Sequence, residues 1–212
     1  MPPHSAIQLP PQERSVFEVL GKAGKKRFYP KNTIILNEGD LSSCLYVIHS
    51  GKLKAFLADE QGREIVLNIM EPGDYFGEMA LIDNEARSAS VMTMEDSQLT
   101  LVSKEEFNGC LTRNPELITP LMLGLVKRLR ISTRKVGSLA LMDVYGRVAS
   151  TLLQLAREQD GKLVIGEKLT HQEIANIVGA SREMVSRIMH DLAEGGYISV
   201  DNKRRIILNE KL

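Results

Sequence analysis

The side chains best suited to bind or transform a ligand lie in the segment 76–91, whose sequence is FGEMALIDNEARSASV. Arg87 offers a cation that can bind a phosphate through two nitrogens, and Ser88 adds a hydroxyl and a backbone N–H. Glu78 can accept a hydrogen bond from a sugar hydroxyl, and Gly77 lets the main chain approach a ligand closely. A short helical turn over residues 78–82 would add free N–H groups for an anion. This combination fits a phosphodiester with one free hydroxyl and an apolar-faced base, as in a cyclic nucleotide.

Simpler interpretations of the same residues remain open. Gly77 could serve only a turn, and Glu78 with Arg87 could form an ordinary ion pair. Glu78, Asp83 and Glu85 could instead be paired carboxylates for acid–base catalysis. No nucleophile-and-base arrangement accompanies them, so we expect no catalytic residues, and a nucleotide-processing enzyme is the less favoured alternative.

The elements that must position this segment are short β-rich runs between residues 33 and 102. Glycine, proline, asparagine and aspartate separate the runs, and no long helical pattern intervenes. This arrangement is typical of an antiparallel barrel or jelly roll, whose interior can hold one small ligand. We expect strands at residues 33–36, 45–48, 52–58, 64–70, 89–93 and 97–102.

Helical patterns follow the predicted strands. Ser103 with Glu106 three residues later predicts a short capped helix. Pro115 then predicts the start of a longer helix that reaches about Met142. Pro120 lacks a backbone donor, so the long helix is alternatively expected to begin there.

The long helix carries apolar residues at alternating intervals of three and four, the spacing of a heptad seam. Ser132 is the single polar residue in this seam, and Thr133 lies beside it. The pattern predicts a homodimeric coiled coil, because a helix packed on its own domain would favour a broader apolar face. Ser132 could alternatively serve only to set the register. The apolar seam residues are Ile118, Met122, Leu125, Leu129, Val136 and Leu139.

The C-terminal part predicts a DNA-binding module. Thr170 with Glu173 caps one helix, Gly179 makes a turn, and Ser181 caps a second helix. Two short helices joined in this way predict a helix-turn-helix, although a plain helical hairpin is an alternative. The first turns of the second helix would meet base edges in a major groove. The predicted DNA contacts are Thr170, Ser181, Arg182, Glu183, Ser186 and Arg187, with Lys203 at the tip of a β-hairpin wing.

Composition narrows the class of protein. The formal net charge is zero, but residues 1–110 hold 11 Lys+Arg and 16 Asp+Glu, whereas residues 111–212 hold 16 and 11. A basic C-terminal half fits a polyanionic partner, here double-stranded DNA. No apolar run approaches the ~20 residues of a membrane span and no signal peptide is recognisable, so we expect no membrane association. Two cysteines without metal-ligand spacing indicate a reducing cytoplasm and no metal site.

These motifs resemble the CRP/FNR superfamily of bacterial transcription regulators. FGEMALIDNEARSASV is similar to its phosphate-binding cassette, RLRISTRKVG to part of its dimerisation helix, and VGASREMVSRIMHDL to its recognition segment. The resemblance implies an α+β fold with three parts. These are a cyclic-nucleotide-binding β-roll, or jelly-roll barrel, over residues 1–112, a dimerisation helix and hinge over 113–142, and a winged helix-turn-helix over 143–212.

The resemblance is closest to the cyclic-AMP-responsive branch and implies roles for individual residues. Arg87 and Ser88 would hold the cyclic phosphate, and Glu78 the ribose 2′-hydroxyl. Ser132 would meet the base in its own subunit and Thr133 the base in the partner. The complete expected nucleotide site is Gly77, Glu78, Met79, Arg87, Ser88, Arg128, Ser132 and Thr133.

The resulting hypothesis is a homodimeric, cytoplasmic transcription regulator that binds a palindromic DNA site, contacts RNA polymerase and responds to cyclic AMP. A regulator of the same fold that answers cyclic di-GMP, cyclic GMP or no nucleotide is the alternative. Arg182, Glu183 and Arg187 imply a TGTGA-like half-site, whereas Ser186 is typical of the branch that reads a TTGAT-like half-site. We therefore expect the shared GA core. The cysteine cluster that holds an iron–sulfur centre in that second branch is missing.

Overall fold

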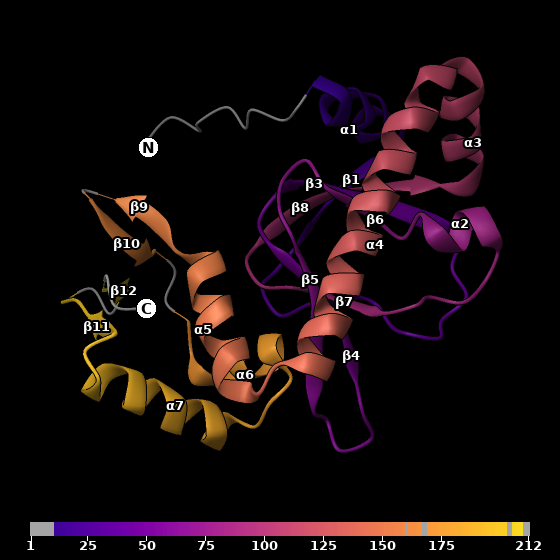
Figure 1. Cartoon of the computed structure of the whole chain (residues 1–212). Helices are drawn as coiled ribbons and strands as arrows, with labels where there is room; N and C mark the ends of the chain where they lie inside the picture. The colour runs from indigo at the N-terminus through magenta and orange to yellow at the C-terminus, as the bar shows by residue number, and fades with distance from the viewer. Residues whose placement is uncertain (1–10, 160, 167–168, 203–204, 210–212) are drawn as a thin grey trace. The chain divides into compact units, whose positions relative to one another are not determined.

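The computed structural model describes residues 11–159, 161–166, 169–202 and 205–209, with side chains from Val16 onward (Figure 1). The chain divides into two compact units, Met1–Leu57 with Leu67–Ser132 and Ala58–Val66 with Thr133–Leu212. Among the described residues, no helix combines the length and apolar character needed to cross a membrane.

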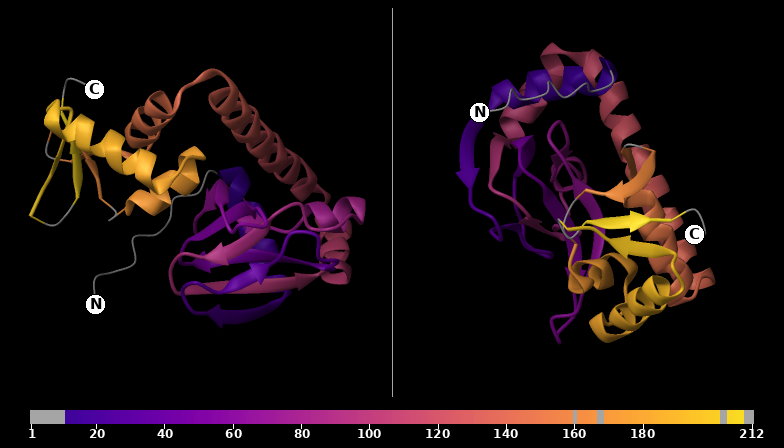
Figure 2. Two further views of the ribbon diagram at one scale, coloured as in Figure 1. Left: turned by 90° about the horizontal axis from the view of Figure 1, so that it is seen from below. Right: turned by 90° about the vertical axis from the view of Figure 1, so that its left-hand side faces the viewer.

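The first unit is built around two four-stranded sheets, one in the order β1-β8-β3-β6 and the other in the order β2-β7-β4-β5. The strand pairs with a described register are antiparallel. The strands form one body in both views of Figure 2, which confirms the predicted β-roll. Their bounds are β1 Lys25–Tyr29, β2 Ile34–Leu36, β3 Cys44–Ser50, β4 Leu53–Ala58, β5 Glu64–Met70, β6 Tyr75–Phe76, β7 Ser90–Thr93 and β8 Ser97–Ser103.

Strand β3 is buried on both faces because it separates two apolar clusters. Leu45 and Val47 pack into a cluster with the helices, whereas Tyr46 and Ile48 pack into the cluster between the sheets. Alternate residues of a strand point to opposite faces, so a strand covered on both sides reads as a continuous apolar run. The sequence LYVI at these positions has this form.

Helical segments pack on the outer face of β3. Helices α1 (Pro11–Ala23) and α3 (Lys104–Arg113) lie side by side (Figure 1), and the 3-10 turn Pro115–Leu117 leads into α4 (Ile118–Leu141). Helix α3 begins with the predicted capping box, since the Ser103 hydroxyl accepts from the Glu106 N–H and the Glu106 carboxylate accepts from the Ser103 N–H.

The expectation that the long helix begins at Pro120 is wrong. Helix α4 begins at Ile118, so Pro120 lies in its first turn. The backbone N–H groups of a first turn have no partner within the helix, and a proline there costs no hydrogen bond.

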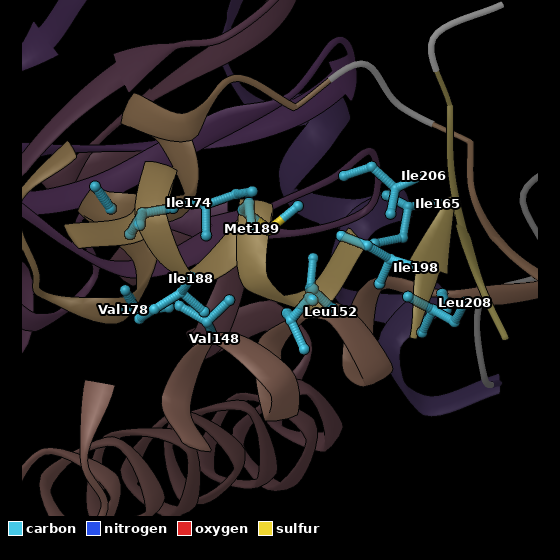
Figure 3. Packing of buried hydrophobic residues seen from close by; sticks show 14 residues of the cluster. Val148, Leu152, Ile165, Ile174, Val178, Ile188, Met189, Ile198, Ile206 and Leu208 are labelled. Carbon is cyan, nitrogen blue, oxygen red and sulfur yellow. The ribbon is translucent and has the colours of Figure 1, made fainter. Parts of the chain in front are cut away.

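Among its described residues, the second unit contains the end of α4, three further helices and a four-stranded sheet in the order β11-β12-β10-β9. The helices α5, α6 and α7 and the sheet share one core, to which Val148, Val178 and Ile188 contribute from the helices and Ile198 and Ile206 from the sheet (Figure 3). The bounds are α5 Val144–Leu155, β9 Arg157–Gln159, β10 Lys162–Ile165, α6 His171–Val178, α7 Arg182–Glu194, β11 Ile198–Val200 and β12 Ile206–Leu208.

The sequence after Asp143 predicts a helix over residues 144–157, and α5 ends two residues earlier, at Leu155. Asp143 caps it as expected and accepts from the Gly146 N–H at 2.7 Å. Arg157, expected as its last residue, instead begins the edge strand β9, which pairs antiparallel with β10. The predicted hairpin wing is confirmed in β11 and β12, while its tip residue Lys203 lies outside the described residues.

Candidate functional site

The first unit contains a cavity of about 280 Å³ between the strands, helix α2 (Met79–Asp83) and helix α4. Leu36, Met70, Phe76 and Val91 form much of its apolar wall. The cavity brings together the predicted nucleotide-site residues Gly77, Glu78, Met79, Arg87, Ser88, Arg128 and Ser132. Thr133 follows on α4 with an exposed side chain and is not among the described lining residues.

Gly77 connects β6 to α2 in a conformation that favours glycine. Its φ of +87° lies in the left-handed region, and a Cβ at this position would lie 2.8 Å from Arg87 Nη1 and 3.2 Å from the carbonyl oxygen of Cys44. A side chain would therefore be strained and would also displace the Arg87 guanidinium. The helical turn predicted at 78–82 is found one residue later.

Arg87 is fixed by groups of its own domain. It is 4% exposed. Nη1 donates to the carbonyl oxygen of Gly77 at 2.6 Å, and Nη2 donates to Ser42 Oγ at 2.8 Å and to the carbonyl oxygen of Cys44. These bonds orient the guanidinium in the cavity wall, and they give Arg87 a structural role in addition to the predicted contact with phosphate.

Glu78 pairs with Arg128 of α4 rather than with Arg87. Glu78 is 1% exposed, and its Oε1 lies 2.6 Å from Arg128 Nη1. Arg128 also donates to the carbonyl oxygen of Tyr75, and its guanidinium lies 4.8 Å above the Tyr75 ring. The simple Glu78–Arg87 ion pair, an open interpretation of the sequence, is thus replaced by a pair that joins the cassette to α4.

The described residues contain two buried side-chain polar atoms without a hydrogen-bond partner, Glu78 Oε2 and Arg87 Nε. Both residues line the cavity. A buried polar atom without a partner is costly, so such atoms call for an explanation. One is a carboxylate acceptor and the other a cationic donor, which are the two groups needed for a ligand with a hydroxyl and an acidic oxygen.

The remaining predicted pocket residues are less enclosed. Ser88 is exposed, and its hydroxyl lies 3.9 Å from the Met79 sulfur. Ser132 is also exposed on α4. Their polar groups remain accessible to a molecule in the cavity.

The second unit contains the predicted helix-turn-helix. Thr170 and Glu173 form a reciprocal capping box at the start of α6, and Gly179 ends α6 with a φ of +66°. Ser181 caps α7 by accepting from the Met184 N–H at 3.2 Å. The hydroxyls of Thr170 and Ser181 therefore contribute to the two caps, besides the DNA contacts predicted for them.

The first turns of α7 present the predicted reading residues on one surface. Arg182, Glu183 and Arg187 are exposed, while Ser186 is half-buried. The pKa of Glu183 is lowered, first by its own backbone N–H and then by the Ser181 hydroxyl. Glu183 is therefore held as a charged acceptor, the form that can accept from cytosine N4.

Two residues that the sequence did not single out support this surface. Arg147 of α5 donates from Nε to the carbonyl oxygen of Val178 at 2.9 Å and so holds the turn between α6 and α7. His171, the first residue of α6, bonds through Nδ1 to Ser186 Oγ at 2.7 Å. Neither contact has a local sequence signal, because the partners are 31 and 15 positions apart.

Fold and site together define a class of protein. A β-roll with a polar cassette in its cavity is joined in one chain to a winged helix-turn-helix. This is the architecture of a ligand-controlled DNA-binding regulator.

Comparisons with known proteins identify the family. Residues 26–114 match the cyclic nucleotide-binding domain, and residues 146–211 match the Crp-like helix-turn-helix domain. The chain is 34% identical to the cAMP-activated global transcriptional regulator Vfr of Pseudomonas aeruginosa, over 97% of this chain and 99% of Vfr. It is 37% identical to the cyclic AMP receptor protein of Thermus thermophilus, over 82% of this chain and 79% of that protein.

A solved structure agrees with these matches. The c-di-GMP responsive global regulator CLP of Xanthomonas campestris superimposes with a TM-score of 0.81 and 27% identity, covering 93% of this chain and 100% of CLP. The chain belongs to the CRP/FNR family and is a cyclic-nucleotide-binding transcription regulator of that type.

Proposed function

We propose that this chain is a homodimeric regulator that binds a palindromic DNA site under the control of cyclic AMP. The observation that carries the proposal is the pair of buried, unpartnered atoms in the cavity, Glu78 Oε2 and Arg87 Nε. A ribose 2′-hydroxyl can donate to the first, and a cyclic phosphate oxygen can accept from the second. The apolar wall of the cavity then faces the base.

Cyclic AMP is favoured as the effector by the relatives. Vfr and the Thermus thermophilus protein are both named for cyclic AMP, and the Vfr match extends over nearly the whole chain. Ser88, accessible beside Arg87, would add a hydroxyl to the phosphate site, and Ser132 and Thr133 would add hydroxyls near the base.

The proposed dimer rests on the heptad seam of α4. Ile118, Met122, Leu129 and Val136 are exposed in the single chain, and Leu129 and Val136 are each 66% exposed. An apolar stripe of this length on one helix is stabilised when a second copy covers it. The seam thus supports a parallel pairing of two α4 helices.

The dimer would present two recognition helices to the DNA. They must stand ~34–36 Å apart to enter successive major grooves on one face of the duplex. Helix α4 carries both the pocket residue Arg128 and the seam, so ligand binding at Arg128 can bias the pairing of the helices. A coupling free energy of ~1–3 kcal/mol is sufficient for such control. The regulator would act in the cytoplasm and meet RNA polymerase at its promoters.

Cyclic di-GMP is the second candidate effector, because CLP is described as c-di-GMP responsive and shares the fold over nearly the whole chain. Cyclic di-GMP carries two phosphodiesters and two bases. It would need a larger site than a single cyclic nucleotide, for which we propose the cavity of about 280 Å³.

Isothermal titration calorimetry of the purified protein with cyclic AMP, cyclic GMP and cyclic di-GMP tests the effector. We expect cyclic AMP to bind most tightly, with one site per chain. Failure of cyclic AMP to bind at tens of micromolar, with binding of another nucleotide, would reassign the effector. Size-exclusion chromatography with light scattering tests the dimer, and a monomer at micromolar concentration would refute it.

A further inference from the structure

The contact between His171 and Ser186 joins the two helices of the helix-turn-helix at the surface that faces DNA. His171 is the first residue of α6, and Ser186 lies one turn beyond Arg182 and Glu183 on α7. Both side chains are half-buried, and His171 Nδ1 lies 2.7 Å from Ser186 Oγ. Ser186 is therefore not a freely rotating hydroxyl on the reading surface.

The direction of this hydrogen bond decides which base groups Ser186 can read. A serine hydroxyl has one proton and two lone pairs, and a neutral imidazole has one N–H and one acceptor nitrogen. If Nδ1 accepts, the serine proton is used and only its lone pairs face the groove. If Nδ1 donates, the serine proton is free to donate to a base carbonyl or ring nitrogen.

The position of His171 selects between the two directions. The first helix of a helix-turn-helix crosses the DNA backbone, so its first residue lies toward the phosphates. Phosphate oxygens are acceptors, and the imidazole can bind one only when Nε2 carries the proton. When the ring is neutral and Nε2 donates to a phosphate, Nδ1 is the acceptor, and Ser186 would donate to it.

We infer that His171 is a positioning residue that makes Ser186 a pure acceptor on the reading surface. Ser186 then recognises an exocyclic amino group of the half-site, adenine N6 or cytosine N4, and rejects a carbonyl at the same position. The inference rests on the proposed DNA-binding function. It attributes the recognition of one base of the half-site to the His171–Ser186 contact. It also gives a role to the hydrogen bond that ties Ser186 to His171 of α6.

Base analogues test the inference directly. Palindromic duplexes with TGTGA-like arms are made with one adenine at a time replaced by purine, or one cytosine by pyrimidin-2-one, which lack the amino group. Fluorescence anisotropy with saturating cyclic AMP at about pH 8 gives the affinity of each duplex. The affinity of wild type should fall about five- to tenfold when the amino group is removed at the one symmetric pair of positions that Ser186 contacts. This is the size expected for the loss of one hydrogen bond.

Ser186→Ala should lose sensitivity to that amino group, and His171→Leu should reduce it, because the freed hydroxyl can then donate as well as accept; the double variant should lose no more than Ser186→Ala alone. His171→Asn is the conservative control, because an asparagine amide can place an acceptor near the position of Nδ1 but cannot reach as far as Nε2. It should keep the amino-group preference and weaken binding to all duplexes by a similar factor. Thermal unfolding of each variant checks that the domain is intact.

The outcomes separate the inference from the function on which it rests. If wild type binds the palindrome and His171→Leu keeps the full amino-group preference, the role of His171 is wrong and the DNA-binding function stands. In another outcome, removal of an amino group from the duplex leaves wild-type affinity unchanged while Ser186→Ala loses the preference for one base of the half-site. Ser186 is then a donor, and the inference is overturned. If wild type binds none of the duplexes with or without nucleotide, the proposed function fails and the inference fails with it.

Discussion

Removing the ribose 2′-hydroxyl from the ligand should weaken binding to the wild-type protein by about 10- to 100-fold. Glu78 is 1% exposed, its Oε1 is bound to Arg128 at 2.6 Å, and its Oε2 has no partner. A hydrogen bond to a charged group contributes ~1.5–3 kcal/mol, and each ~1.4 kcal/mol is a factor of ten in affinity. The free Oε2 is the acceptor that the 2′-hydroxyl would fill.

The matched variant is Glu78→Gln, which keeps an acceptor for Arg128 and replaces the charged Oε2 by a neutral amide group. A neutral hydrogen bond contributes ~1 kcal/mol, so the same ligand change should cost this variant about fivefold. Calorimetry with cyclic AMP and 2′-deoxy cyclic AMP on both proteins gives the four affinities of the cycle. An equal loss in the two proteins, or no loss in wild type, would show that Glu78 does not hold the hydroxyl.

Four further changes have defined outcomes. Arg128→Leu leaves the Glu78 carboxylate buried without its partner and should lower the free energy of unfolding by about 3 kcal/mol in urea titrations; a loss below about 1 kcal/mol would contradict the pair. Gly77→Ala adds a Cβ at a φ of +87° against Arg87, so it should cost about 1–2 kcal/mol of stability and also reduce nucleotide affinity; unchanged calorimetry would argue against the close contact. The pKa of His49 is lowered from its ordinary 6.5 by burial and then by Lys26, so the unfolded chain binds the proton first and stability should fall as the pH drops below about 6.5; His49→Gln should flatten that dependence in thermal melts, and an unaltered slope would exclude His49 as its source. Arg187→Ala should weaken specific DNA binding by about 1–3 kcal/mol and leave nucleotide affinity in the absence of DNA unchanged, and an equal loss for random DNA would assign Arg187 to phosphate instead.

Elements with a local cause were predictable from the sequence. The capping boxes Ser103/Glu106 and Thr170/Glu173 and the turn at Gly179 all involve groups within a few residues of one another. The apolar run LYVI likewise predicts a buried strand, which the structure confirms as β3.

Elements without a local signal were missed. Strand β1 has four exposed residues in the run KKRFY, and its pairing with β8 depends on residues about seventy positions away. The short strand β9 is likewise exposed, and the helical pattern over residues 144–157 overlaps its first residue, Arg157. Exposed edge strands carry little apolar alternation from which they could be recognised.

The candidate site shows the same division. The cassette supplies its residue types in one segment, but the partners that orient them come from elsewhere. Arg128 is 50 positions from Glu78, and Ser42 is 45 positions from Arg87. Spacing along the chain contains no information on such pairs, and only the folded roll and α4 bring them together.

The linked titration of nucleotide and DNA tests whether cyclic AMP controls DNA binding by this protein. The anisotropy of a labelled palindromic duplex is measured against protein concentration at increasing cyclic AMP, and cyclic AMP affinity is measured with and without the duplex. We expect saturating cyclic AMP to tighten DNA binding by about 5- to 150-fold and DNA to tighten cyclic AMP binding by the same factor. DNA affinity that is independent of cyclic AMP, in a protein that binds cyclic AMP, would contradict it.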